Sequence, residues 1–370
     1  MTNVVTAGSM TAEELQISPD YVRISMAAAI ELRLKAGRLL RDCGCGCINL
    51  LQHYPEGCYA NCTYCGLARE RPGVPEDNTF IRVAWPLYPT DLVAERIAEK
   101  EAGGGVGRVC IAQVQDARAY DDLVDMTLRI RRAAKAVPIS ALISATTLNE
   151  ERLYQIQEAG ADIIGVGLDA ASEEVFYQTR GRGARGPHKW DYHWQIIRAA
   201  RRIYGPMKVN CHVVVGLGEA DRDLVNLFFQ CQSEQIAVYL FSFNPELGTV
   251  MQDVPRAPLP RWRRMQLVKH LIENCNLQRE AIEFDADGNL SRIHVSGNTL
   301  DATVGSGLPF MTNGCPGRDG KVACNRPYGS YRPGEEFRDY PFLPNSEDLV
   351  QIRLQTRADE IQFAGSSVAS

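Results

Sequence analysis

The sequence has no long apolar run, no signal-peptide pattern in its first residues and no excess of positive charge. No segment approaches the roughly 18 consecutive apolar residues that suggest a membrane span. The first residues lack the basic start and apolar stretch of a signal peptide. The formal net charge of −5 offers no overall attraction to nucleic acid. We therefore expect a cytoplasmic protein that binds neither a membrane nor nucleic acid.

The sequence also lacks a Gly-x-Gly-x-x-Gly turn after its first expected strand, so it does not carry the motif of a dinucleotide-binding sheet. Cysteines stand there instead. Twelve cysteines are many for a reducing compartment, in which stable disulfides are rare. Four lie singly in apolar stretches and are expected to be buried small hydrophobes: Cys110, Cys211, Cys231 and Cys275. The other eight lie in groups, which points to bound metal.

Short apolar runs alternate with amphipathic segments along most of the chain. The apolar runs predict strands over residues 48–54, 108–113, 139–144, 162–168, 208–215 and 237–244. The amphipathic segments predict helices over residues 90–102, 120–136, 149–159, 190–204, 221–232 and 259–274. Six strands, each followed by a helix, favour a parallel α/β sheet. Periodicity alone does not separate an open barrel from a flat doubly wound sheet.

Four parts of the chain follow from these patterns. Residues 1–18 are expected to form a disordered tail, and residues 19–47 a helix (about residues 20–40) with a cysteine-rich segment. The βα units occupy residues 48–278. Residues 279–370 are expected to form an irregular C-terminal extension on the barrel, with two further cysteines and a disordered end at residues 364–367.

Three cysteines follow the first expected strand with the spacing Cys-x3-Cys-x2-Cys: Cys58, Cys62 and Cys65. Thiolates are the usual ligands of iron–sulfur clusters, and three of them leave one iron free to bind a small molecule. A structural zinc site normally needs four ligands, which this spacing does not offer. Chance placement is the other alternative. The carboxyl end of a barrel strand is where active sites gather.

This motif, with an aromatic residue before its last cysteine, resembles that of the radical S-adenosylmethionine (radical SAM) enzymes. The resemblance implies a partial (β/α)6 TIM-like barrel and a [4Fe-4S] cluster whose free iron binds S-adenosylmethionine. It also implies one-electron reduction, release of a 5′-deoxyadenosyl radical and hydrogen abstraction from a substrate. An electron donor of the ferredoxin or flavodoxin type is implied as a partner.

The resemblance further implies contacts with S-adenosylmethionine by several residues at strand ends. Tyr64 is expected near the adenine, with a plain packing role as the alternative. Gln115 lies where the family often has a Gly-Gly-Glu turn, which this sequence lacks. Asp169 and Glu219 follow strands, where carboxylates suit hydroxyl and ammonium donors but equally suit helix caps. Arg185 lies in a basic, glycine-rich loop over residues 180–189 that suits a carboxylate or an acidic partner, or is merely solvated.

The remaining grouped cysteines suggest a second cluster. Cys43, Cys45 and Cys47 alternate with glycines, so in an extended chain their thiols point to one side. Cys315 and Cys324 add two thiols. Five thiols exceed the four that a second [4Fe-4S] cluster needs, and Cys47 is the expected surplus. Structural zinc and inert thiols are the alternatives.

A second cluster next to the cysteine triad narrows the chemistry. The stretches over residues 48–58, 65–72, 243–249 and 324–329 resemble the biotin-synthase-like branch, and most of all the two-component lipoyl synthases of archaeal type. That resemblance implies sulfur insertion into an octanoyl chain on a carrier domain or peptide, with an auxiliary cluster as sulfur donor and a paired radical SAM subunit. The sequence lacks the Cys-x4-Cys-x5-Cys motif of ordinary lipoyl synthase.

Two other functions stay open. A radical mutase or lyase acting on a small amino acid, like methylornithine synthase or the hydrogenase-maturation enzymes, would need no sulfur donor. A non-enzymatic iron–sulfur electron carrier would not need six βα units.

Overall fold

A computed structural model of the protein describes residues 16–73, 79–80, 83–329, 335–357 and 360–363. Six parallel strands form its centre: β2 (Cys47–Leu51), β4 (Arg108–Ala112), β5 (Ile139–Ile143), β6 (Ile163–Asp169), β7 (Val209–Val215) and β8 (Ala237–Ser242). They lie side by side in the order in which they occur along the chain. A doubly wound sheet reverses its strand order at a switch point. The order here is not reversed, so the sheet is a barrel and not a flat doubly wound sheet. All six predicted strands are confirmed.

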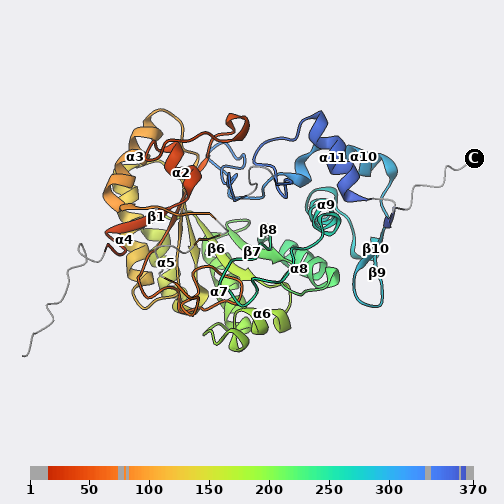
Figure 1. Ribbon diagram of the computed structural model, residues 1–370, viewed down its shortest axis with the longest axis horizontal. Coiled ribbons are helices and arrows are strands. Elements are labelled where there is room, and N and C mark those ends of the chain that lie inside the picture. The colour runs from red at the N-terminus through yellow and green to blue at the C-terminus, as the bar shows by residue number, and fades with distance from the viewer. Residues whose placement is uncertain (1–15, 74–78, 81–82, 330–334, 358–359, 364–370) are drawn as a thin grey trace, which may run out of the picture.

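Helices lie around the sheet (Figure 1). They are α3 (Thr90–Ala102), α4 (Ala119–Ala133), α5 (Glu150–Glu158), α6 (Glu173–Thr179), α7 (Trp190–Tyr204), α8 (Asp221–Ser233) and α9 (Leu259–Cys275). Short 3-10 turns are η1 (Leu40–Asp42), η3 (Ala145–Thr147), η4 (Arg182–Ala184), η5 (Arg279–Ala281) and η6 (Leu308–Phe310). The six predicted helices are confirmed, whereas α6 was not predicted.

The barrel is partial. Its edge strands are β8 on one side and β3 (Leu87–Pro89) on the other, and these two do not pair with each other in the described part of the chain. The predicted partial (β/α)6 barrel is therefore correct. Apolar residues of the strands and of the inner helix faces form one large core. None of the helices described is long and apolar enough to cross a membrane.

The predicted helix over residues 20–40 is wrong. The chain instead forms β1 (Tyr21–Ile24), which pairs antiparallel with both β2 and β3, and only then the short helix α2 (Met26–Glu31). The sheet overrides the helical spacing because the β1 backbone can hydrogen-bond on both sides. The predicted tail is also partly wrong, since Ile17 and Ser18 are buried. Residues 1–15 lie outside the described residues.

The C-terminal extension is more regular than expected. It contains α10 (Gly297–Ser306), α11 (Ser346–Thr356) and a small sheet of β9 (Ile282–Phe284), β10 (Leu290–Ile293) and β11 (Gln362–Phe363). In Figure 1 these elements lie beside α9, next to the barrel. The expected disordered end at residues 364–367 lies outside the described residues.

The extension also seals the amino ends of the barrel strands. Gly46 lets Ala323 approach so closely that an added Cβ would lie 2.6 Å from the Ala323 carbonyl oxygen. Arg108 is buried at the start of β4. Its guanidinium donates to both carboxylate oxygens of Asp162, at 2.6 and 3.1 Å, and to the Pro316 carbonyl at 2.7 Å. These contacts bring the late cysteines under the barrel.

Candidate active site

The cysteine triad lies in the loop that follows β2, at the carboxyl end of the barrel strands. The Cys58 N–H donates to the Leu67 carbonyl at 2.9 Å, and the Cys65 N–H donates to the Cys62 carbonyl at 3.1 Å. The side chain of Asn61, with a φ of +55°, donates to the Ala184 carbonyl at 2.8 Å. Hydrogen bonds within the triad loop and one to the neighbouring basic loop therefore fix its conformation.

The three thiols lie close enough to affect one another. Burial raises the pKa of each, that of Cys62 to about 12, and Cys58 and Cys62 add to this rise at Cys65. Backbone N–H groups donate to two of the sulfurs, from Gln115 to Cys58 at 3.2 Å and from Leu67 to Cys65 at 3.5 Å. Such donors stabilise thiolate ligands, so the triad fits a cluster bound by three thiolates.

A buried ion pair lies beside the triad. Asp169 ends β6 with a φ of +59°, and its Oδ2 accepts a hydrogen bond of 2.5 Å from the Tyr64 hydroxyl. The same oxygen is ion-paired with Arg180, which is only 6 % exposed. The positive charge of Arg180 lowers the pKa values of Cys58 and Cys62 against the effect of burial. Tyr64 and Asp169, which the sequence predicted separately, are therefore parts of one network.

Arg180 is the member that sequence reasoning missed. The sequence predicted Arg180 only as a member of the basic loop. In the structure it is the C-cap residue of α6, a helix that was not predicted, and its side chain is buried. Its Nε has no hydrogen-bond partner among the described residues. The sequence did hold one signal for this role: Arg180 directly follows the amphipathic stretch Glu173–Thr179, which itself follows Asp169.

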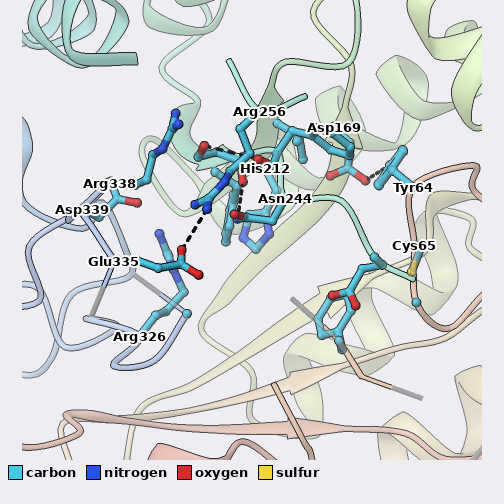
Figure 2. A pocket seen from close by; sticks show the side chains of 18 of the residues that line it. Tyr64, Cys65, Asp169, His212, Asn244, Arg256, Arg326, Glu335, Arg338 and Asp339 are labelled. Carbon is cyan, nitrogen blue, oxygen red and sulfur yellow. Dashed lines mark hydrogen bonds and ion pairs between the residues drawn. The ribbon is translucent and has the colours of Figure 1, made fainter. Parts of the chain in front are cut away.

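A cavity opens next to this network, between β7, β8 and the C-terminal extension (Figure 2). Its lining includes Tyr64, Cys65 and Asp169 on the triad side. The opposite wall is charged, and there Arg256 is ion-paired with Glu335 at 2.9 Å. Cys65 of the triad and charged residues from the C-terminal part of the chain therefore line the same cavity.

A second, more apolar cavity adjoins the first on the side of the amino ends of the strands. Both are lined by the same five residues, Phe80, His212, Phe241, Arg326 and Gly329. Four thiols line the second cavity: Cys45, Cys110, Cys315 and Cys324. The barrel interior therefore has triad chemistry at one end and a second group of thiols at the other.

The second group of thiols differs from the predicted one. Cys47, Cys315 and Cys324 pack together with Cys110 beside them. A hydrogen bond from Cys47 lowers the pKa of Cys324 to about 6, and Arg326 contributes. Cys110 was expected to be a buried small hydrophobe; it is half-buried and lines the second cavity beside these thiols. It points inwards from β4 because strand residues alternate and its neighbour in register is Asn49 of β2.

Among the other single cysteines, Cys211 and Cys231 are buried as predicted, and Cys275 is exposed on α9, contrary to prediction. Cys43 is only half-buried and does not line either interior cavity. Among the residues that the structure describes, no three Cys, His, Asp or Glu side chains are arranged around a single metal ion.

The family model "Radical SAM superfamily" matches residues 54–231, which contain the triad and four of the six parallel strands. The chain belongs to the radical SAM superfamily. Within it the chain is of the biotin-synthase-like branch. It is 24 % identical over 186 residues to biotin synthase of Rhodopseudomonas palustris, covering 49 % of this chain and 46 % of that protein. It is 23 % identical over 200 residues to biotin synthase of Aquifex aeolicus, covering 54 % and 55 %.

The chain thus spans about half the length of the curated relatives it matches. Solved structures give weaker likenesses. Methylornithine synthase (PylB) has a TM-score of 0.46 at 14 % identity, covering 67 % of this chain and 66 % of that one. The hydrogenase maturase HydG of Carboxydothermus hydrogenoformans has a TM-score of 0.47 at 13 % identity, covering 90 % and 75 %.

Gln115 and Arg185, the next two residues predicted to contact S-adenosylmethionine, lie at different distances from the triad. Gln115 lies at the triad: its N–H donates to Cys58 and its carbonyl accepts from Tyr59 at 2.9 Å. Its contact with S-adenosylmethionine stays a prediction. Arg185 is ion-paired with Glu70 and its side chain is 75 % exposed, so it lies on the outside of the radical SAM barrel.

Glu219 does not cap the following helix, since the N-cap of α8 is Ala220. Its carboxylate accepts from the backbone N–H groups of Gly216 and Leu217, both at 2.9 Å, and pairs with Arg261 at 3.0 Å. These contacts stabilise the turn after β7. Its contact with the cofactor also stays a prediction, but this carboxylate is already used within the fold.

Asp339, in the charged wall of the first cavity, predicts a pH dependence of stability. Burial raises its pKa to about 7, against the opposing charge of three arginines. Between about pH 4 and pH 7 the unfolded carboxyl is ionised while the folded one keeps its proton, so stability falls as pH rises through this window and is level above it. Relative to Asp339→Asn, the wild type should lose up to about 4 kcal/mol of unfolding free energy across the window. Denaturant titrations from pH 4 to pH 8 measure this, and parallel curves for the two proteins would exclude it.

Proposed function

We propose that this radical SAM enzyme inserts sulfur into an octanoyl chain bound to a carrier domain or peptide, with a second iron–sulfur cluster as the sulfur donor. The observation that carries the proposal is the pair of adjoining interior cavities, which share five lining residues. One is lined by Cys65 of the triad and the other by four thiols at the other end of the barrel. A substrate carbon placed between these ends has a radical source on one side and sulfur on the other.

The triad end would hold the cofactor of hydrogen abstraction. When bound, a reduced [4Fe-4S] cluster and S-adenosylmethionine supply the 5′-deoxyadenosyl radical. Cys58, Cys62 and Cys65 would hold the cluster. Tyr64 and Asp169 line the adjoining cavity and are held in place by their mutual hydrogen bond. Arg180 places a buried positive charge beside the thiolates and compensates part of the negative charge there.

The second cavity suits an alkyl chain. Its walls are mostly apolar, from residues such as Leu50, Val83, Trp85, Leu142 and Phe241. Burying an aliphatic chain against such walls contributes about 0.8 kcal/mol per CH₂ group. An apolar wall also keeps water away from a carbon radical.

The second thiol group would hold the sulfur donor. Cys45, Cys110, Cys315 and Cys324 are the four thiols that face the cavity, and four thiolates suit a [4Fe-4S] cluster. Cys47 packs behind them and Cys43 lies outside. This ligand set replaces Cys43 and Cys47 of the predicted group with Cys110.

A radical mutase or lyase on a small amino acid is the second candidate. The charged wall favours it, since Arg256, Glu335 and Arg338 would suit the carboxylate and ammonium groups of a zwitterion. In that case the second thiol group would be structural.

One anaerobic experiment separates the two candidates. The protein is reconstituted, its iron and sulfide are counted, and reductant, S-adenosylmethionine and an octanoyl-lysine peptide are added. Sulfur insertion predicts about eight irons per chain and a thiolated peptide detected by mass spectrometry. About four irons with 5′-deoxyadenosine and an unchanged peptide would exclude it and favour the mutase or lyase.

A further inference from the structure

The sulfur of Cys315, one of the thiols that line the second cavity, faces hydrogen-bond donors on two neighbouring strands. The Tyr239 hydroxyl on β8 donates to it, and Nδ2 of Asn210 on β7 donates to it at 3.7 Å. Tyr239 pairs in register with His212, two residues after Asn210, so the Tyr239 and Asn210 side chains point to the same side of the sheet. Two strands of the barrel therefore direct donors at one sulfur.

Asn210 occupies its position at a cost to stability. It is only 1 % exposed, and its Nδ2 also donates to the Ile164 carbonyl at 3.3 Å. Its Oδ1 is buried and has no hydrogen-bond partner within the described ranges of the chain. An unpaired buried polar atom costs about 1–3 kcal/mol, which an apolar side chain at this position would avoid. The amide is therefore better explained by its contact with sulfur than by packing.

The neighbouring strand β6 makes room for this amide. Gly165 of β6 lies opposite Asn210 in the register of the sheet. A Cβ added at Gly165 would lie 2.9 Å from the Asn210 Oδ1, which is closer than such atoms approach in folded proteins. The glycine thus leaves the space that the Asn210 side chain fills.

Two further groups support a charged sulfur at Cys315. Burial raises the pKa of Cys315 to about 11, whereas the Arg108 guanidinium and the hydroxyls of Tyr239 and Ser140 act to lower it. The Ser140 hydroxyl is also within hydrogen-bond reach of Cys110. Because that hydroxyl has one proton, it serves one sulfur at a time. Tyr239 and Asn210 are therefore the donors dedicated to Cys315.

We propose that Tyr239 and Asn210 are positioning residues that set the reduction potential of the second iron–sulfur cluster through their hydrogen bonds to Cys315. The inference rests on the second cluster of the proposed function and not on which substrate the enzyme takes. A cluster that gains one electron becomes more negative, so donors to its ligand sulfur stabilise the reduced form more than the oxidised one. Each donor therefore raises the potential, and removing one lowers it.

Tyr239→Phe tests the inference on the full-length, reconstituted protein, because it removes the hydroxyl and keeps the ring. Both clusters are titrated with a reductant and followed by electron paramagnetic resonance. We expect the equilibrium constant for one-electron reduction of the second cluster to fall about tenfold, which is about 59 mV. Asn210→Leu should lower the potential in the same direction, and the double variant should lower it further. The triad cluster, recognised by the signal that Cys62→Ser lacks, should keep its potential.

Tyr204→Phe is the matched control. Tyr204 is a buried tyrosine whose hydroxyl donates to the Leu153 carbonyl at 3.1 Å, and it lines neither interior cavity. Its loss should leave both potentials unchanged. An equal shift of both clusters in Tyr239→Phe would overturn the inference, since the effect would then not act through Cys315.

The iron count separates this inference from the proposed function. Wild type, Tyr239→Phe and Asn210→Leu should each bind about eight irons. Equal potentials for all three at that iron content would overturn the inference and leave the proposed function standing. About four irons in the wild type would overturn the inference together with the second cluster. A potential shift at full iron content with an unchanged octanoyl peptide would support the inference and exclude sulfur insertion.

Discussion

Cys62→Ser is expected to abolish formation of 5′-deoxyadenosine. Cys62 is the central and most buried cysteine of the triad, at 7 % exposure, and no other thiol of the loop can replace it without moving the backbone. Serine is a poor ligand for a cluster because its hydroxyl is not ionised near neutral pH and iron–sulfur clusters are held by thiolates. The loss should be to background, because the chemistry requires the triad cluster.

Two measurements make this result specific. Iron content should fall by about four per chain, and 5′-deoxyadenosine should vanish with any reductant. Cys275→Ser is the control, because Cys275 is exposed on α9 and lies outside both interior cavities. Cluster loss in the control, or wild-type 5′-deoxyadenosine in Cys62→Ser, would contradict the assignment of the triad.

The second large effect is expected at Cys110. Cys110→Ser should remove the proposed second cluster and reduce the proposed sulfur insertion to background, while 5′-deoxyadenosine is still formed. The physical reason is that Cys110 faces the cavity with Cys315 and Cys324, and removing one of four ligands leaves an iron incompletely held. The variant should therefore bind about four irons in place of about eight.

Cys43→Ser is the matched variant for this test, because the sequence placed Cys43 in the second ligand set and the structure places it outside the cavity. On the proposed function, it should retain about eight irons and full sulfur insertion. If Cys43→Ser lost the second cluster and Cys110→Ser kept it, the ligand set proposed from the cavity would be wrong and the one predicted from the sequence would stand.

Much of the fold could be predicted because the barrel is built from local repeats. The six parallel strands are mostly apolar runs, and the helices that come between and after them have an apolar face, so pattern and structure agree. β1 could not be predicted because Tyr21–Ile24 gains its conformation from pairing with β2 and β3. Such pairing joins segments far apart in the sequence, and local spacing does not report it.

The candidate site divides in the same way. Cys58, Cys62 and Cys65 lie within eight positions of one another, so their meeting is set by spacing. Arg180 and Asp169 form a pair beside them only because β6 and the end of α6 meet there. Cys110 looked like a core residue because it is flanked by Val109 and Ile111, and only its inward direction on β4 reveals its neighbours.

The sequence by itself determined the family, the βα order and the triad, because each depends on residues that are close together along the chain. The tertiary structure decided between barrel and doubly wound sheet through the strand order. It also decided which thiols face the interior cavity, with Cys110 in and Cys43 out. The reason is that a cavity is enclosed by segments from the whole chain, here from Ser25 to Gly329, and their meeting depends on long-range packing that no local pattern encodes.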